Sequence, residues 1–124
     1  MIKGIGIDVI EIERIKEAVE KFGDSFLGKV FTKKEINYCR RRKALRYPEL
    51  AVRFAAKEAY AKAIGTGIKG FGRNNNGIYW TDVEIVNNSH GKPLLSIKGN
   101  ILDKAHVSLS HSRDFAVASV YVEE

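Results

Sequence analysis

Residues 48–67 read PELAVRFAAKEAYAKAIGTG, and this stretch predicts a helix from Pro48 to Ile64. Proline suits the first turn of a helix, where its missing N–H costs no hydrogen bond, and alanine is the strongest helix former. The glycines of Gly65-Thr66-Gly67 stop the helix. Because alanine leaves little bulk on a helix surface, we expect this helix to pack tightly and to lie centrally in the fold.

The same helix carries charged side chains at helical spacing. Glu58 and Lys62 are four residues apart, so they project from one face at roughly 6 Å from each other. Arg53 and Lys57 form a second such pair on an adjacent face. An isolated pair of this kind is usually a salt bridge on a solvated helix. In a tightly packed helix that leads into a glycine turn, with Lys69 just beyond, the same charges are candidates to line a site.

The amino-terminal segment from Ile2 to Ile10 alternates as a strand does. One face carries β-branched residues, and the other carries Gly4, Gly6 and Asp8. Two glycines on one face let a phosphate or another backbone approach closely. Asp8 then either stands beside that approach or caps the helix that starts near Glu11.

Further elements follow from periodicity and turn residues. Glu11 to Phe26 predicts a helix with Gly23 at or just beyond its end, and Thr32 and Glu35 predict a capping box that opens a helix to about Arg42. One apolar stripe of the first of these helices consists of Ile12, Ile15, Val19 and Phe22. Strands are predicted at 82–86, 93–98, 106–112 and 115–122, with turns at 88–91 and 112–114. We therefore expect a single α+β domain over residues 1–124, with early helices packed on a mostly antiparallel sheet.

Composition narrows the class of protein. The chain has 124 residues, a net charge of +6 and one cysteine, Cys39, which excludes an intrachain disulfide and predicts a lone buried thiol in a reducing compartment. No apolar run approaches the roughly 20 residues of a membrane span, so we expect a soluble, cytoplasmic protein. The positive charge favours an anionic partner, which could be nucleic acid, a phosphorylated cofactor or an acidic protein.

Asp8 and Glu58, on separate elements and near cations, predict a magnesium–phosphate site. Magnesium takes oxygen ligands, often only one or two carboxylates, with waters and substrate phosphate completing its octahedron. Lys62 could neutralise charge on a leaving oxygen. The glycine turn lacks the Gly-x4-Gly-Lys-Ser/Thr order, which argues against a nucleotide triphosphatase.

Three other features are less specific. His111 shares a strand face with Val107 and Leu109, which favours a partly buried, hydrogen-bonded histidine, and the scattered histidines offer no zinc spacing. Residues 40–46 form a basic cluster. Residues 69–77 predict a mobile loop, and the segment 69–80 could fold over a ligand or form a plain surface insertion.

Three segments together resemble one known family. They are Gly4–Glu11 (GIGIDVIE), Arg53–Ala59 (RFAAKEA) continuing to Lys62 and the glycine turn, and Ser108–Ser112 (SLSHS). Each is similar to a motif of the bacterial holo-acyl-carrier-protein synthases, the small class of 4′-phosphopantetheinyl transferases. The segments occur in the family's order and span nearly the whole chain.

The resemblance implies a fold, a cofactor and a co-substrate. In such a protein Asp8 and Glu58 would hold magnesium against the pyrophosphate of coenzyme A, and Lys62 would contact the phosphates. Larger relatives have a further acidic residue where this chain has Ile10, so water would fill that coordination position. The members of this class look like homotrimers with active sites at subunit interfaces.

The resemblance also implies the residues around the nucleotide and the reaction. Arg53, Gly65 and His111 would bind the nucleotide end of coenzyme A, in part in a site shared with a neighbouring subunit. A serine of apo acyl carrier protein would attack the β-phosphate, release 3′,5′-ADP and so support fatty acid biosynthesis. Glu58, directly or through a water, would be the candidate base.

The acidic carrier protein would dock on the first helix, where Arg14, Ala18 and Lys21 share a face and Lys16 does not. Asp24 interrupts the positive run, and the cluster at 40–46 could instead face the 3′-phosphate or be solvated. Two other functions stay open: a nucleic-acid-binding module, and a different magnesium phosphotransferase on a similar scaffold. Against the first, the aromatic residues do not interleave with basic ones as a base-stacking platform requires.

Overall fold

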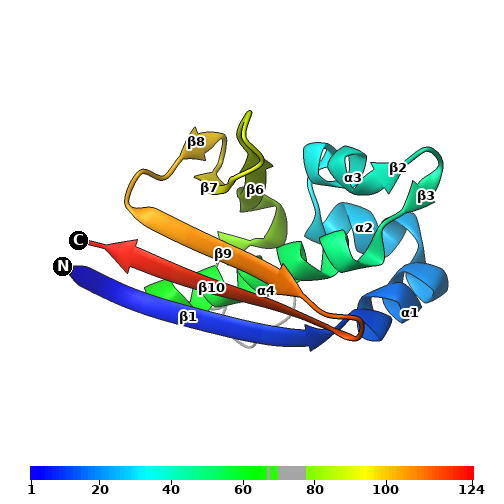
Figure 1. Cartoon of the computed structure of the whole chain (residues 1–124), viewed down its shortest axis with the longest axis horizontal. Helices are drawn as coiled ribbons and strands as arrows, with labels where there is room; N and C mark the ends of the chain where they lie inside the picture. Colours follow the sequence, from blue (N-terminus) through cyan, green and yellow to red (C-terminus); the bar gives the residue numbers. More distant parts are fainter. Residues whose placement is uncertain (67, 70–77) are drawn as a thin grey trace.

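Helix α4 (Tyr47–Ile64) crosses one face of a three-stranded antiparallel sheet in the computed structural model (Figure 1). The structure describes residues 1–66, 68–69 and 78–124. The strand order of this sheet is β1 (Ile2–Glu11), β10 (Phe115–Glu123) and β9 (Ala105–His111). The two ends of the chain lie together at one end of the sheet, where the Glu124 N–H donates to Met1 O at 3.1 Å.

The remaining elements cover the other side of α4. The early part of the chain forms three short helices and a hairpin: α1 (Ile12–Phe22), α2 (Asp24–Val30), α3 (Lys33–Cys39), β2 (Arg40–Arg41) and β3 (Ala44–Leu45). The later part forms a parallel pair, a 3-10 turn and a second antiparallel sheet: β4 (Ile68–Lys69), β5 (Ile78–Tyr79), η1 (Trp80–Asp82), β6 (Val83–Asn87), β7 (Pro93–Ile97) and β8 (Asn100–Ile101). The predicted α+β fold with mostly antiparallel pairing is confirmed, and among the described residues the strands divide into separate ladders.

Two helix boundaries differ from the prediction. The helix expected over 11–26 ends at Phe22, because Gly23 adopts φ 55° and a new helix starts at Asp24. The helix after Thr32 begins with the predicted capping box but ends at Cys39, where the chain turns into the β2–β3 hairpin. Phe22, assigned by periodicity to a buried stripe, is 57% exposed because its helix ends there.

The two glycines of β1 let its backbone meet the backbone of α4. A Cβ built on Gly4 would lie 1.9 Å from Ala63 O, and one built on Gly6 would lie 1.8 Å from Ala59 O. No side chain larger than hydrogen fits either position, and the facing alanines complete the close packing. The sequence left open whether a phosphate or another backbone lies against these glycines, and the structure shows that the backbone of α4 does. Asp8, on the same face of β1, therefore lies beside α4.

The opposite face of β1 is apolar and uncovered in the single chain. Ile5, Ile7 and Val9 are each more than half exposed. The alternation predicted for β1 is thus confirmed. In the described part of the chain, no helix is long and apolar enough to cross a membrane.

Candidate active site

Asp8 and Lys62 meet where β1 runs alongside the last turns of α4. The Lys62 ammonium donates to Asp8 Oδ1 at 3.1 Å and to Ile7 O at 3.1 Å. The lysine side chain is 55% exposed and the aspartate side chain 18%. Glu11 occupies the N-cap of α1 and makes no side-chain cap, so the alternative in which Asp8 caps this helix is wrong.

Glu58 lies close enough to Asp8 and Lys62 for their charges to shift its pKa. Burial raises the pKa of the Glu58 carboxyl above its ordinary 4.5, the Asp8 carboxylate raises this pKa further, and the Lys62 ammonium opposes the shift. Lys62 pairs with Asp8 rather than with Glu58, so the ordinary i,i+4 bridge on a solvated helix does not describe this cluster. The fold brings two carboxylates and one cation together from β1 and α4.

Two carboxylates that repel one another form a donor set that suits a hard divalent cation. Among the described residues, no group of three or more His, Cys, Asp or Glu side chains is placed to hold a metal. The carboxylates that meet beside Lys62 are two, those of Asp8 and Glu58. That number fits magnesium, which often takes one or two carboxylates and completes its shell with water and phosphate. The donor chemistry therefore fits the predicted ion.

The glycine turn directly follows this cluster. Gly65 ends α4 in the left-handed conformation, at φ 78°, as glycine allows. Gly67, residues 70–77 and the side chain of Lys69 lie outside the described residues. The predicted loop over 69–77 and its possible closure over a ligand consequently stay predictions.

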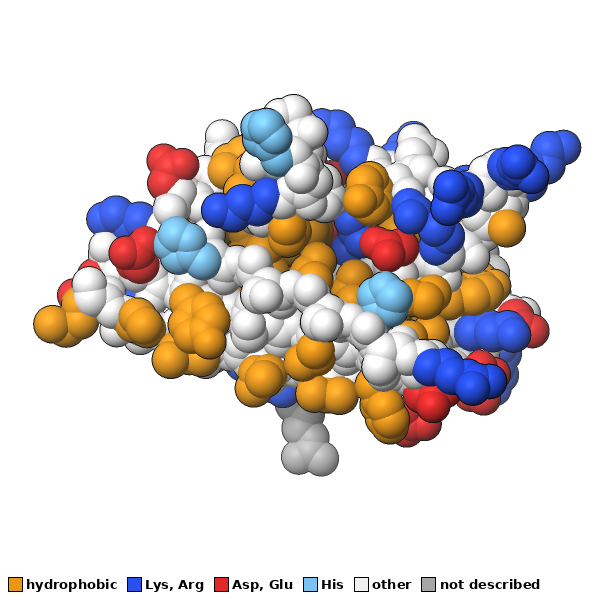
Figure 2. Space-filling model, in the orientation of Figure 1, with side chains coloured by type: hydrophobic (Ala, Val, Ile, Leu, Met, Phe, Trp, Pro, Cys, Tyr) orange, Lys and Arg blue, Asp and Glu red, His pale blue; other side chains and the backbone are white. Residues whose placement is uncertain are grey.

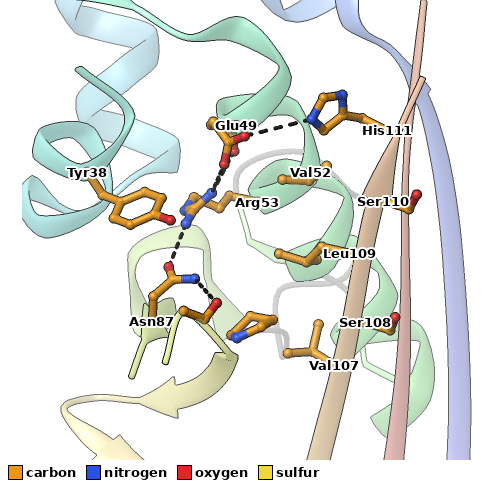
Figure 3. Close-up of a pocket in the computed structure, with 12 residues that line it drawn as sticks. Tyr38, Glu49, Val52, Arg53, Asn87, Val107, Ser108, Leu109, Ser110 and His111 are labelled. Atoms are coloured by element: carbon orange, nitrogen blue, oxygen red, sulfur yellow. Dashed lines mark hydrogen bonds and ion pairs between the residues drawn. The ribbon is translucent and has the colours of Figure 1, made fainter. Parts of the chain in front are cut away.

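Arg53 occupies a second site, a cavity of about 320 Å³ between α3, α4, β6 and β9 (Figure 3). Its guanidinium is 1% exposed and donates to Glu49 O at 3.0 Å, to Glu49 Oε2 at 3.4 Å and to Asn87 Oδ1 at 2.7 Å. The Tyr38 ring stacks under it, with 4.3 Å from Cζ to the ring centroid. His111 Nε2 lies 3.8 Å from Glu49 Oε1.

His111 reaches this cavity from β9 but is less buried than predicted. Val107 and Leu109 point into the cavity on the same side, whereas Ser108 and Ser110 point away from it (Figure 3). The face assigned from parity is right. The imidazole is 43% exposed because β9 is an edge strand that ends here. Besides its approach to Glu49, it makes one long hydrogen-bond contact, 3.4 Å from Nδ1 to Ser112 O.

The two clusters lie at opposite edges of the three-stranded sheet. Asp8 on β1 pairs with Ala118 on β10, which pairs with Leu109 on β9. Two strand spacings, roughly 10 Å, therefore separate the Asp8 edge from the edge that carries His111. On α4 itself, Arg53 and Glu58 are five residues apart and project about 140° from each other. One chain thus presents two half-sites that face different directions.

The predicted carrier-binding residues lie on α1 beside an apolar depression. Arg14 and Lys21 are exposed and Ala18 is half-buried. A cavity of about 350 Å³ opens next to them and is lined by Ala18, Phe22, Ser25, Phe26 and Lys29. The exposed Phe22 ring, with the Lys21 ammonium 5.3 Å from its centroid, belongs to this surface and was missed because periodicity assigned it to the core.

Most of the basic cluster at 40–46 faces solvent, and one member contacts Tyr38, a residue that lines the Arg53 cavity. Arg40, Arg41, Arg42 and Lys43 are exposed on the β2–β3 hairpin, where blue side chains gather at the upper right of Figure 2. Arg46 instead turns inward, donates to Tyr38 O and lies over the Tyr38 ring.

Comparison with known proteins gives one consistent result. Residues 4–120 match the model of the 4′-phosphopantetheinyl transferase superfamily. The holo-[acyl-carrier-protein] synthase of Halothermothrix orenii is 46% identical over 132 aligned residues, covering 100% of this chain and 99% of the relative. The chain belongs to the 4′-phosphopantetheinyl transferase superfamily. The family recognised from three motifs is thereby confirmed, as is the prediction that the chain is an enzyme of the phosphopantetheinyl transferase class.

Solved structures of the superfamily agree over the full length. The holo-(acyl-carrier-protein) synthase from Bacillus anthracis, in complex with CoA (3′,5′-ADP), is 38% identical with a TM-score of 0.78 and covers 100% of this chain and 98% of its own. The synthase of Helicobacter pylori in complex with coenzyme A is 29% identical with a TM-score of 0.77, over 96% of this chain and 99% of that one.

Sequence reasoning missed several residues around the two half-sites. Glu49 lies one helical turn before Arg53, and that spacing could have flagged the pair. Tyr38 and Asn87 have no sequence signal, because tertiary packing alone brings them to Arg53. Lys57 was grouped with Arg53 as a charged pair on one face of the helix, and both side chains are buried, so the alternative of a solvated pair is wrong.

Proposed function

We propose that this chain transfers the 4′-phosphopantetheine group of coenzyme A to a serine of apo acyl carrier protein and releases 3′,5′-ADP. The observation that carries the proposal is the cluster of Asp8, Glu58 and Lys62, which the close β1–α4 contact assembles at the surface. Relatives named as holo-[acyl-carrier-protein] synthases, including structures with coenzyme A bound, support the substrate. The cytoplasmic location of this protein and its part in fatty acid biosynthesis stay predictions.

The acids and the lysine divide the phosphate chemistry between them. Asp8 and Glu58 would hold magnesium, which when bound offsets charge on a diphosphate and polarises its phosphorus. Lys62 is exposed enough to turn from Asp8 toward a phosphate, where its ammonium would stabilise the departing oxygen. Glu58 is the candidate base for the serine hydroxyl, directly or through a water, because its carboxylate stands beside Asp8 and Lys62 where the diphosphate would bind.

The Arg53 cavity suits the nucleotide end of coenzyme A. Arg53 and His111 offer cationic or donor groups to a phosphate, and the aromatic ring of Tyr38 and the apolar side chains of β9 offer a surface for a base. The pocket belongs to the opposite edge of the sheet from Asp8. A complete site is then formed by the Asp8 edge of one copy and the Arg53 edge of the next.

Such a contact joins two different surfaces and closes into a ring, as in a homotrimer. The apolar face of Ile5, Ile7 and Val9 offers area for it, since each of these side chains is more than half exposed in a single chain. Mixing two inactive variants, Glu58→Gln and Arg53→Gln, tests the shared site. If subunits exchange, mixed oligomers should regain part of the transfer rate, whereas sites confined to one chain would regain none.

A mass measurement tests the transfer itself. We expect apo carrier incubated with the protein, coenzyme A and magnesium to gain the mass of one phosphopantetheine group, and excess EDTA to prevent the gain. A protein that retains RNA and leaves the carrier mass unchanged would instead be a nucleic-acid-binding module. Phosphate transfer to another acceptor would indicate a different magnesium phosphotransferase.

The carrier surface is tested by charge reversal on α1. We expect Arg14→Glu to raise KM for an acidic carrier about five-fold, with coenzyme A binding unchanged, because an exposed charge mainly steers encounter. Lys16→Glu makes the same change in charge on another side of the helix and serves as the control. Equal effects of the two variants, or a loss of coenzyme A binding in Arg14→Glu, would remove this surface from carrier recognition.

A further inference from the structure

Lys57 is fully buried next to Glu58 in the sequence, and the proposed reaction does not use it. Its side chain is 0% exposed, and Nζ donates to Glu35 Oε1 at 2.6 Å, to Val30 O at 2.7 Å and to Trp80 O at 3.1 Å. An ammonium has three N–H donors, so these three oxygens satisfy it completely. Lys57 therefore ties α4 to the end of α2, to α3 and to η1.

Glu35 extends these contacts to the second sheet. Its Oε2 accepts from the backbone N–H of Ile85 on β6 at 2.9 Å, and its Oε1 accepts from the Thr32 N–H at 2.9 Å. The side chain is 0% exposed. The same carboxylate thus starts α3, fixes the edge of β6 and pairs with α4.

The elements fixed in this way are those that build the Arg53 cavity. Tyr38 comes from α3, Asn87 comes from β6 two residues beyond Ile85, and Arg53 lies one turn before Lys57 on α4. The bond from Arg53 to Asn87 Oδ1, at 2.7 Å, forms only if β6 stands at the correct distance from α4.

We infer that the buried Lys57–Glu35 pair is a positioning pair for the Arg53 cavity. It holds α3 and β6 against α4 so that Tyr38, Asn87 and Arg53 form a preorganised wall for the nucleotide end of coenzyme A. This inference rests on the proposed function, in which that cavity receives the nucleotide. Neither Lys57 nor Glu35 contacts the substrate.

Energetic arguments favour a positioning role for the Lys57–Glu35 pair over a contribution to the stability of the fold. Burial lowers the pKa of Lys57 and the Glu35 carboxylate opposes that shift, as expected for a charge held in the interior. Replacing a buried ion pair by apolar side chains of similar size is often neutral or stabilising. Apolar side chains cannot make directional hydrogen bonds. Besides the bond between its two members, this pair makes four hydrogen bonds to other elements and loops.

Two variants test the inference by nucleotide binding. Lys57→Met removes the ammonium at similar length, and Glu35→Gln removes the negative charge while keeping a residue that suits the capping box. We expect the dissociation constant for 3′,5′-ADP, measured by calorimetry, and KM for coenzyme A to rise about tenfold in each. The value of kcat at saturating coenzyme A and KM for the carrier should stay within about twofold of wild type.

Val120→Ala is the matched control. Val120 is a fully buried side chain of β10, outside the pair, so its truncation should lower Tm without changing 3′,5′-ADP affinity. Unchanged affinity in folded Lys57→Met or Glu35→Gln protein overturns the inference, and so does an equal loss of affinity in Val120→Ala. If Lys57→Met does not fold, Glu35→Gln decides. Wild-type protein that binds 3′,5′-ADP but modifies no carrier refutes the proposed transfer alone, because the binding comparison still stands.

Discussion

Two lysine–carboxylate clusters lie along α4, and they differ in how fully their charges are satisfied. Lys57 and Glu35 are both 0% exposed, and every donor of the ammonium has an oxygen partner within the protein. Five residues later Lys62 meets Asp8 at the surface, and Glu58 stands beside them with a raised pKa. The first cluster is closed to ligands and the second is open.

The difference shows that residue type alone does not tell a structural lysine–carboxylate cluster from a functional one. Lys57 and Glu58 are neighbours in the sequence, yet one faces the interior and the other faces Asp8. Perturbed carboxylates at a surface mark a place where a cation or a polar ligand would lower the free energy. A buried ion pair whose hydrogen bonds are all made within the protein marks a place where neighbouring elements are fixed relative to one another.

The sharpest way to break this comparison is to remove the charge of the open cluster. We expect Glu58→Gln and Asp8→Asn to lower the rate of carrier modification at least about a hundredfold, because each removes a ligand for the cation and Glu58 is also the candidate base. Far-UV circular dichroism should show an unchanged fold. The control is Asp103→Asn, an exposed acid in a distant turn. A near-normal rate in either variant at saturating magnesium would exclude that residue from the site.

The next test asks whether close packing of β1 on α4 assembles the open cluster. We expect Gly6→Ala to destabilise the protein by about 3 kcal/mol or more, since its Cβ would lie 1.8 Å from the Ala59 carbonyl oxygen and neither backbone can yield easily. Gly28→Ala is the matched control, because Gly28 lies in α2 with nothing within 4 Å of an added Cβ. That control should be neutral or more stable by about 0.5–1 kcal/mol. Equal denaturant midpoints for the two variants would contradict the packing argument.

The smallest expected effect concerns pH and sharpens the contrast between the clusters. The pKa of Glu58 is raised in the folded protein, so its favourable contribution to stability is complete below the ordinary value of 4.5 and is lost as pH rises through the folded-state pKa. Glu58→Gln cannot titrate. Its Tm relative to wild type in metal-free buffer should therefore increase between pH 4 and pH 7. A Tm difference that does not change with pH would show that burial and Asp8 do not raise the pKa of Glu58.

Local patterns settled much of the fold. The capping box of Thr32 and Glu35, the proline start and glycine end of α4, and the alternation of β1 depend on neighbours within a few residues, and all are present. Two predictions of burial were wrong, and in both the side chain lies at the end of its element. Phe22 fits an apolar stripe but lies where the helix stops, and His111 has the correct parity but lies at the end of an edge strand.

The sequence by itself determined the family, the main helix and strand, and the acids and lysine most suited to a magnesium–phosphate site, because motifs and periodicity are local. Only the tertiary structure decided which charges meet. It paired Lys62 with Asp8 rather than Glu58, and it buried Lys57 against Glu35. It also placed His111, and the cavity that His111 shares with Arg53, at the edge of the sheet opposite Asp8. The physical reason is that burial and the approach of separate elements, which no spacing along the chain encodes, fix the energy of each charge.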